Sequence, residues 1–350
     1  MIIGYVGGYR GIVKTDSIDV WRLSHINYAF VDISNNRAWL HNESTDTINL
    51  RKLSALKNIN NNLKIMISIG GWTWSKNFSD AVLTDSSTKK FAESAVAIVA
   101  KYDLDGVDID WEYPGMQGDS NIYRPHDKEG YTMLFKDLRT GLDSLKKITG
   151  RRYFISTAVG GSEEYIEHTE MKKVAAYADY INVMSYDYAD GSDSMSNHHT
   201  NLFTSSKNFD QYSADRSIRA FINAGVPAKK IVIGIAFYGK GWQMRTNDNN
   251  GLYRTALKPA HGGGFTYLKD SIINRKGFTR FWDSTAKAPY LFNDSTKVFI
   301  SYDDEESVKA KCEYIKKYHL GGAMFWEYND DKKEYLLKTI AKVFNYAVKN

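Results

Sequence analysis

The sequence predicts an α/β protein, a closed (β/α)8 barrel with a small α+β insertion between its seventh and eighth strands. Eight short apolar segments alternate with helical patterns along the 350 residues, and this alternation is typical of a parallel sheet. A chain of this length suits a closed eight-fold barrel that carries an insertion. Roughly sixty residues separate the last two strand candidates, far more than a βα loop requires.

The strand candidates are rich in Val, Ile and aromatic residues, and turn residues flank several of them. In chain order they are Ile2–Val6, His25–Val31, Leu63–Ile69, Gly106–Trp111, Tyr153–Val159, Tyr180–Ser185, Ile231–Phe237 and Gly322–Trp326. Segments with apolar residues at helical spacing lie between and after them. We expect helices over Leu50–Ile59, Ser87–Lys101, Asp127–Ile148, Asp215–Ala224, Glu305–Tyr318 and Tyr335–Val348.

The long segment after the seventh strand breaks the alternation. Residues 241–298 contain a run of three glycines, many aromatic residues and short β-like stretches. We therefore predict a small α+β insertion domain there, at the carboxyl-terminal face of the barrel, where it would form a wall beside the site. The barrel itself would comprise residues 1–240 and 299–350.

The most informative motif lies at the fourth strand, where residues 105–114 read D-G-V-D-I-D-W-E-Y-P. Asp108, Asp110 and Glu112 alternate with Val107, Ile109 and Trp111. Because successive side chains of a strand point to opposite faces, the three carboxyl groups would share one face, about 6 to 7 Å apart. Carboxylates this close repel each other unless some hold protons. The pattern indicates an acid/base device with a raised pKa and a coupled titration, and a solvated edge strand is the alternative.

Other strand ends bring binding residues to the same face, since active sites of such barrels lie at the carboxyl ends of the strands. The third ends in S-I-G-G-W (68–72), the sixth in M-S-Y-D (184–187), the seventh in F-Y-G (237–239) and the eighth in M-F-W (324–326). Together they would surround one pocket with acids, phenols and indoles, as a glycosidase needs. The high aromatic content agrees, because Tyr and Trp suit sugar rings.

Composition excludes several other classes. The hydrophobic content of 43% allows a full core, and a mean hydropathy of −0.46 indicates a soluble protein. No apolar run is long enough to span a membrane. The net charge is +5, and the basic residues are dispersed, which argues against nucleic-acid binding.

Cysteine and histidine usage gives no sign of a metal or cofactor. Cys312 is the single cysteine, so an internal disulfide is impossible, and we expect it to be partly buried and inert. His198 and His199 are adjacent in a polar loop without an evident third ligand. We expect these histidines to be solvated or to serve as caps.

The acidic motif, S-I-G-G-W and M-S-Y-D, in this order, resemble the signature set of family 18 glycoside hydrolases, the chitinases. The likeness runs from Gly4-Tyr5 to Trp326, nearly the whole chain. The insertion also resembles that of the subgroup with an α+β domain, at N-G-L-Y (250–253), A-P-Y (288–290) and S-Y-D-D (301–304). The resemblance implies a (β/α)8 TIM barrel and retaining hydrolysis of β-1,4-linked N-acetylglucosamine polymers, in which the substrate's own acetamide acts as nucleophile.

The resemblance also assigns roles. Glu112 would be the general acid and then the base, and Asp110 would orient the acetamido N–H. Asp108 would share a proton with Asp110, with Tyr5 and Ser68 hydrogen-bonded to that pair, and Tyr186 would donate to the acetamido oxygen. The catalytic set is thus Glu112, Asp110, Asp108 and Tyr186. The substrate-binding set is Trp326 as the floor, with Trp72, Gly71, Thr73, Tyr113, Met184, Asp187, Tyr238, Phe30, Tyr5 and Ser68.

Two positions depart from the family pattern. Lys240 stands where many relatives carry Arg, and Lys cannot make a bidentate planar contact. The first strand ends Gly7-Gly8-Tyr9, where an aromatic residue often follows directly. Either Tyr9 replaces that residue or a distal sugar subsite is missing.

Two other functions remain open on this sequence. An endo-β-N-acetylglucosaminidase acting on N-glycans would need the same acetamide, and a chitinase-like lectin would bind sugar without cleaving it. Such lectins usually lack the acidic Glu, which is present here as Glu112. We expect chitin or N-acetylglucosamine oligosaccharides as the partner of a monomer. Because that polymer is extracellular, we expect a secreted or periplasmic protein, although the chain shows no signal peptide.

Overall fold

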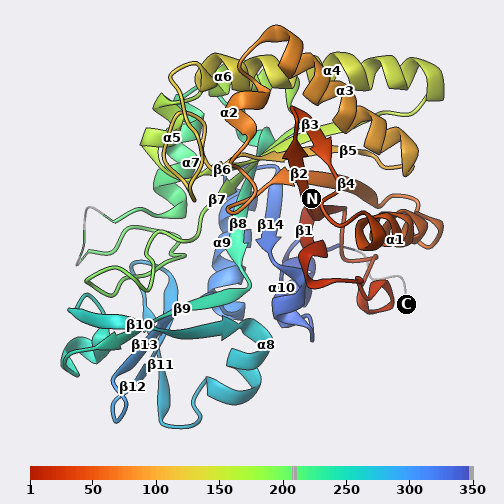
Figure 1. The fold of residues 1–350 in the computed structure, drawn as a ribbon. Coiled ribbons are helices and arrows are strands. Elements are labelled where there is room, and N and C mark those ends of the chain that lie inside the picture. The colour runs from red at the N-terminus through yellow and green to blue at the C-terminus, as the bar shows by residue number, and fades with distance from the viewer. Residues whose placement is uncertain (207, 209–210, 347–350) are drawn as a thin grey trace.

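The computed structural model describes residues 1–206, 208 and 211–346 and confirms the (β/α)8 TIM barrel (Figure 1). All strand pairs of the barrel are parallel, and β1 pairs with both β14 and β2, so the sheet is closed. The barrel strands are β1 (Ile2–Gly7), β2 (His25–Ser34), β4 (Lys64–Gly70), β5 (Gly106–Asp110), β6 (Phe154–Gly160), β7 (Tyr180–Met184), β8 (Ile231–Ala236) and β14 (Gly322–Trp326). Each lies within a few residues of its predicted bounds.

Helices surround the barrel strands and bury their outer faces. They are α1 (Glu43–Ala55), α2 (Phe78–Ala81), α3 (Asp85–Lys101), α4 (Asp127–Thr149), α5 (Glu163–Glu167), α6 (Met171–Tyr177), α7 (Ala214–Asn223), α9 (Glu305–Lys317) and α10 (Tyr335–Val343). Within the described part of the chain, none of the helices is both long and apolar enough to cross a membrane.

Helix bounds agree with the predictions where the sequence carries a clear start or stop signal. Helix α3 begins after Thr84, whose side chain accepts from the Ser87 N–H, and α9 begins after Asp304 in the same way. Helix α4 ends at Thr149 and is capped by Gly150, whose φ of 72° favours glycine. The C-terminal helix was expected over Tyr335–Val348, and the observed helix α10 ends at Val343. Residues 347 and 348 of the expected range lie outside the described part of the chain.

The predicted secondary structure differs from the observed one in the start of α1, in three short helices and in one short strand. Helix α1 starts at Glu43, seven residues before its expected start at Leu50. Helices α2, α5 and α6 were missed because they are too short to show a helical period. The antiparallel strand β3 (Arg37–Trp39) was also missed, although Asn35-Asn36, both with positive φ, is a typical hairpin turn.

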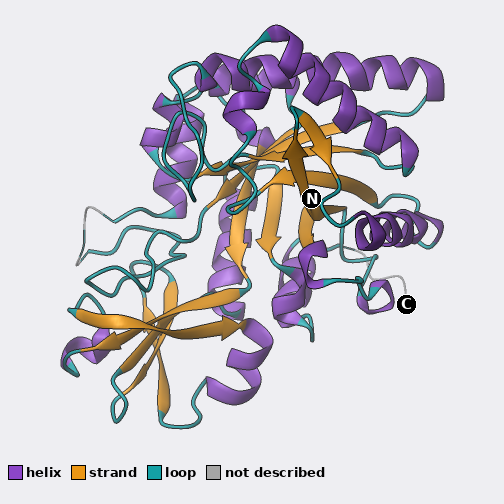
Figure 2. Ribbon diagram, in the orientation of Figure 1, coloured by secondary structure: helices purple, strands orange, loops and turns teal. Residues whose placement is uncertain are grey.

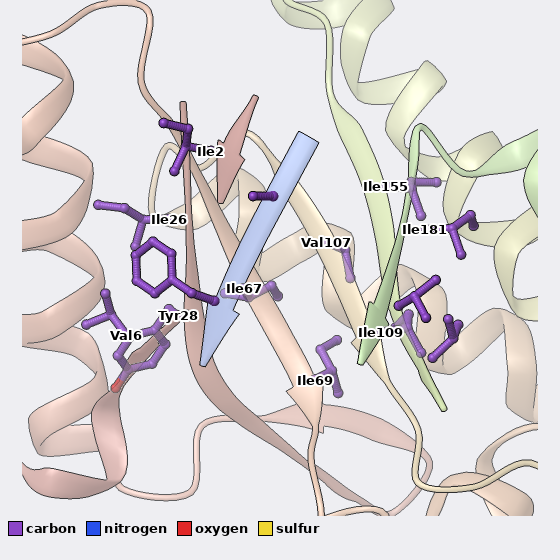
Figure 3. Packing of buried hydrophobic residues seen from close by; sticks show 14 of the residues in the cluster. Ile2, Val6, Ile26, Tyr28, Ile67, Ile69, Val107, Ile109, Ile155 and Ile181 are labelled. Carbon is purple, nitrogen blue, oxygen red and sulfur yellow. The ribbon is translucent and has the colours of Figure 1, made fainter. Parts of the chain in front are cut away.

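Alternation along the strands separates the apolar shell from the polar interior of the barrel. Val107, Ile109 and Trp111 are fully buried, and Figure 3 shows Val107 and Ile109 in the core with residues of the neighbouring strands. The Trp111 ring stacks on Phe78 of α2, with centroids 4.9 Å apart. Because these side chains face outward, Asp108 and Asp110 must face into the barrel.

The long segment after β8 forms a second, antiparallel sheet, which lies at lower left in Figure 2. Its order is β10-β9-β13-β12-β11, and a short helix α8 (Phe265–Tyr267) follows β10. The strands are β9 (Tyr238–Met244), β10 (Ala256–Gly264), β11 (Phe278–Asp283), β12 (Ala288–Asn293) and β13 (Val298–Ser301). The sheet has an apolar cluster of its own around Trp242 and Phe299. The division into two domains at residues 241–298 stays a prediction.

A buried ion pair joins the end of this sheet to the barrel. Lys311 of α9 and Asp303, just after β13, have fully buried side chains, with Nζ and Oδ2 2.6 Å apart. Thr200 Oγ1 and the Ala236 N–H donate to the same oxygen at 2.8 and 3.2 Å, and Ser307 Oγ donates to Oδ1 at 2.7 Å. Every charge-bearing atom of the pair therefore has a partner, which is the condition under which a buried pair is tolerated.

Candidate active site

Asp108 is the most deeply buried carboxylate of the acidic motif, and its neighbours in the sheet supply its hydrogen bonds. Ser68 on β4 and Ser156 on β6 stand beside it in the strand register. Their hydroxyls donate to it at 2.7 and 2.6 Å, Tyr5 donates at 2.9 Å, and Asn182 Nδ2 donates at 3.3 Å. Burial raises the pKa of Asp108, and these four donors oppose that shift.

Asp110 lies two residues beyond Asp108 on β5, nearer the carboxyl end of the strand, and has a different environment. Its register neighbours are Gly70 and Ala158, which offer no side-chain donor. Its Oδ1 atom is buried without a hydrogen-bond partner. Burial, and then the charges of Glu112 and Asp108, raise its pKa well above the usual value. Asp110 is thus a buried carboxyl group with an oxygen that can still accept a hydrogen bond.

Glu112 follows β5 and is held by its backbone. Its N–H donates to Ser75 Oγ at 2.9 Å, and Ser75 Oγ in turn donates to the Gly71 carbonyl at 2.8 Å. Burial raises the pKa of Glu112 to about 7; the nearby charge of Asp187 adds to the rise, and a hydrogen bond with Tyr113 opposes it. A carboxylic acid with this pKa can deliver a proton near neutral pH.

A pocket of about 320 Å³ opens beside Glu112, between the ends of β5, β6 and β7. This volume lies in the usual range for small-ligand sites. Its lining residues are Glu112, Tyr113, Met116, Gly160, Gly161, Ser162, Tyr165, Met184, Tyr186, Asp187, Tyr188 and Tyr212. Burial raises the pKa of Tyr186, so its phenol keeps its proton, and the hydroxyl has only a weak contact with Met324 Sδ at 3.8 Å. A second cavity of about 410 Å³, beside Thr15–Trp21, is lined by none of the predicted site residues.

Asp187 is fixed at the edge of this pocket by three partners. Tyr238 Oη donates to it at 2.7 Å, His199 Nδ1 lies at 3.5 Å and Lys240 Nζ at 3.4 Å. Although burial acts in the opposite direction, the hydrogen bond and charge of His199 and the charge of Lys240 hold the pKa of Asp187 below its usual value. Lys240 also pairs with Asp190 at 2.7 Å, so both of its partners are carboxylates of this chain.

Trp326 ends β14 and is the centre of an aromatic group on the opposite side of the barrel top. Phe30 stacks on it with centroids 5.3 Å apart, and Tyr9 lies nearly parallel to it at 6.4 Å. Tyr5 is tilted against it at 5.8 Å. A half-buried indole in this position offers an apolar floor for a sugar ring.

The turn after β4 carries three predicted binding residues, Gly71, Trp72 and Thr73, which differ in how far they are exposed to solvent. Gly71 has a φ of 80°, and a Cβ there would lie 2.5 Å from the Phe30 ring, so only glycine fits. Trp72 is half-exposed, with its ring 6.2 Å from Tyr113. Thr73 is exposed. Of the predicted site residues, five line the pocket, namely Glu112, Tyr113, Met184, Tyr186 and Asp187, whereas Gly71, Trp72 and Thr73 do not.

The sequence did not reveal two residues of the site. Ser156 and Asn182 bind Asp108 and could be found only from strand register. Within the expected aspartate pair, Asp108 is the member to which Tyr5 and Ser68 donate.

The expectation of solvated histidines was wrong. His198 and His199 are fully buried, with Asp283 and Asp187 as their partners at 3.4 and 3.5 Å. Cys312 is fully buried rather than partly so, and burial raises the pKa of its thiol to about 12.

An acid with a raised pKa, placed with two more carboxyl groups and an aromatic floor at the carboxyl ends of barrel strands, is an arrangement that suits glycoside hydrolysis. Comparison with known proteins gives the family. The family model for glycosyl hydrolases family 18 matches residues 1–331, and the chain belongs to this family.

Individual relatives agree in fold and sequence. Chitinase A1 from Niallia circulans is 37% identical over an alignment of 403 positions, which covers 96% of this chain and 57% of that protein. The chain therefore spans little more than half the length of that curated relative. The structure of a family 18 N-acetylglucosaminidase from Paenibacillus barengoltzii is 39% identical, with a TM-score of 0.91 over 98% of this chain and 99% of that one. Chitinase ChiA74 from Bacillus thuringiensis is 33% identical, with a TM-score of 0.93 over 100% of this chain and 70% of that one.

Proposed function

We propose that this glycoside hydrolase is a chitinase that hydrolyses β-1,4-linked N-acetylglucosamine chains with retention and with the substrate's acetamide as nucleophile. The observation that carries the proposal is the arrangement of Glu112, Asp110 and Tyr186. Glu112 is an acid with a pKa near 7, and Asp110 has an unpartnered oxygen in a layer of small residues. The names of Chitinase A1 and ChiA74 support the substrate class. Because this polymer lies outside cells, we further propose that the protein is exported.

In the first step, Glu112 donates its proton to the glycosidic oxygen. The acetamido carbonyl oxygen attacks the anomeric carbon as the bond to that glycosidic oxygen breaks, and the leaving sugar departs with a new hydroxyl group. The product at the anomeric carbon is an oxazolinium ion, which carries positive charge on the former acetamide. Glu112 is left as a carboxylate.

Asp110 and Tyr186 would hold the acetamide in line for this attack. The free Oδ1 atom of Asp110 can accept the acetamido N–H, and a carboxylate there would stabilise the developing positive charge. The Tyr186 hydroxyl keeps its proton and can donate to the acetamido oxygen. Asp108, held by four donors, would fix the layer beneath Asp110 and share a proton with it, because the charges of the two carboxyl groups repel each other.

In the second step, water attacks the anomeric carbon from the face that the leaving sugar vacated. Glu112 takes a proton from this water, the ring carbon–oxygen bond of the oxazolinium breaks, and the acetamide is restored. Two inversions give net retention, and Glu112 returns to its protonated form.

Tyr186→Phe tests the donor to the acetamide. We expect kcat for N-acetylglucosamine oligomers to fall by about 10- to 100-fold, because the lost hydrogen bond strengthens as charge develops. Tyr123→Phe, a change at an exposed tyrosine, is the matched control and should leave kcat unchanged. Equal rates for Tyr186→Phe and the intact protein would remove Tyr186 from the catalytic set.

The pKa of Glu112 predicts the alkaline side of the pH profile. The acid must be protonated in the free enzyme, so kcat/KM should fall about tenfold per pH unit above about pH 7. Asp187→Asn removes a negative charge that raises this pKa, so the fall should begin at lower pH. A kcat/KM that stays constant to pH 9 would contradict the assignment of Glu112 as the acid.

Product analysis distinguishes this function from the two alternatives. N-acetylglucosamine oligomers and a high-mannose glycopeptide would be supplied separately, and the anomeric form of the first product would be read by NMR. Release of the β-anomer from the oligomers supports the proposal. Cleavage of the glycopeptide alone would indicate the N-glycan enzyme, and binding without cleavage would indicate a lectin.

A further inference from the structure

A charged pair stands beside the aromatic floor, on the rim of the barrel away from the pocket. Arg10 follows β1 and Glu327 follows β14, whereas the pocket lies between the ends of β5, β6 and β7. Arg10 donates to Glu327 Oε1 through Nε at 2.7 Å, and Nη2 of the same guanidinium lies 2.5 Å from that oxygen as an ion pair. The pair therefore occupies the side of the barrel opposite Glu112.

Glu327 is fully buried and fixes the pair in place. Its second oxygen, Oε2, is buried and has no hydrogen-bond partner. A Cβ on Gly7 would lie 2.6 Å from that oxygen and 2.7 Å from the Tyr9 ring, so glycine at this position lets the carboxylate and the ring pack against the strand. The buried carboxylate thus positions Arg10 and helps to fix the position of the Tyr9 ring.

Tyr9 and Arg10 form the exposed part of this rim. The Tyr9 residue is 50% exposed and the Arg10 side chain 52% exposed. The Tyr9 ring is inclined by only 17° to the Trp326 ring, and the two ring centroids are 6.4 Å apart. A guanidinium group carries five N–H donors, and the pair with Glu327 uses two of them. Tyr9 takes part of the remaining capacity, because Arg10 also bonds its side chain and lies over its ring, 5.4 Å from the centroid; the other donors are available for a ligand at the edge of the floor.

The direction of a bound sugar chain follows from the position of the acid. Glu112 must face the oxygen of the bond that breaks, so the leaving part of the chain lies on the pocket side. The sugar whose anomeric carbon is attacked, called the −1 sugar, rests on Trp326. Its 4-hydroxyl, or the next sugar attached there, must then point toward Tyr9 and Arg10.

We propose that Tyr9 and Arg10 close the cleft directly behind the −1 sugar, with Arg10 bonding the free 4-hydroxyl of a non-reducing end. The enzyme then removes single N-acetylglucosamine units from that end and does not cut inside the chain. This inference rests on the proposed function and specifies its cleavage mode. Glu327 acts through Arg10 and is a positioning residue.

The first test uses the intact protein and needs no variant. Tetra-N-acetylchitotetraose is compared with the same oligomer capped by a 4-O-methyl group at its non-reducing end. We expect monosaccharide and trisaccharide as the first products of the free oligomer, and at least a 100-fold lower rate for the capped one. First release of disaccharide, or equal rates for both oligomers, overturns the inference.

The second test removes the donor. Arg10→Ala should lower kcat/KM for the p-nitrophenyl glycoside of N-acetylglucosamine by about 10- to 100-fold, the usual effect of losing a hydrogen bond to a charged group. It should also raise the relative rate on the capped oligomer. Arg51→Ala, a change at an exposed arginine of α1, is the matched control and should alter neither rate. A fall in disaccharide release by Arg10→Ala would instead show that Arg10 binds a second sugar, and the inference would be wrong.

Failure of the proposed function has a different signature. If neither oligomer is cleaved, or if cleavage persists in Glu112→Gln, the chemistry itself is wrong. If both oligomers are cleaved with retention and with dependence on Glu112, the chemistry holds and only the end-specific mode fails.

Discussion

Glu112→Gln is expected to reduce the hydrolysis rate of N-acetylglucosamine oligomers by about 10²- to 10⁴-fold, the usual contribution of a general acid. The amide keeps the shape of the side chain but cannot donate a proton to the glycosidic oxygen. The backbone contact of residue 112 with Ser75 does not depend on the side chain, so the loop should keep its place. Rates would be measured as release of reducing ends under saturating substrate.

Two comparisons make this result specific. Glu43→Gln is a change at an exposed glutamate of α1, and it should retain the full rate. Glu112→Gln should still bind oligomers, because the floor at Trp326 and the pocket residues are unchanged. Residual activity within threefold of the intact protein would exclude Glu112 as the acid.

Lys311→Met is expected to lower the free energy of unfolding by about 3 to 5 kcal/mol, the usual cost of leaving one partner of a buried ion pair uncompensated. Asp303 would lose its Nζ contact at 2.6 Å while remaining fully buried beside Thr200. Methionine has a similar length, so the loss of charge rather than a cavity dominates. Urea unfolding, followed by circular dichroism, gives the free energy.

The neighbouring Lys309 supplies the control. Its side chain is 64% exposed, and its Nζ lies 3.8 Å from Glu313 at the surface. Lys309→Met should change the free energy of unfolding by less than about 0.5 kcal/mol, since exposed pairs contribute little. A double variant, Lys311→Met with Asp303→Asn, removes the uncompensated charge but keeps an amide oxygen as acceptor for the neighbouring donors, so it should recover part of the lost stability. Equal stability of Lys311→Met and the intact protein would refute the account of this pair.

Much of the barrel could be predicted because its signals are local. Each strand carries an apolar run of its own, and longer helices such as α3 and α4 show a full helical period. Short elements were missed for the same reason, since α5 and α6 have five and seven residues and cannot display a period. Polar partners across the barrel were also missed. Ser156 and Asn182 are 48 and 74 residues from Asp108 in the chain, and only strand register brings them to it.

Three features could be derived from the amino-acid sequence alone: the barrel, the alternation that turns Asp108, Asp110 and Glu112 to one face, and the family resemblance. These follow from side-chain periods of two in strands and from motifs of a few adjacent residues. Tertiary structure alone decided which carboxyl group is saturated by donors and which is left free, because donors come from neighbouring strands. It also decided that His199 is buried against Asp187 and that Arg10 meets Glu327 across 317 residues of chain. Such contacts join residues that lie far apart in the chain, and no local pattern indicates which of these residues meet.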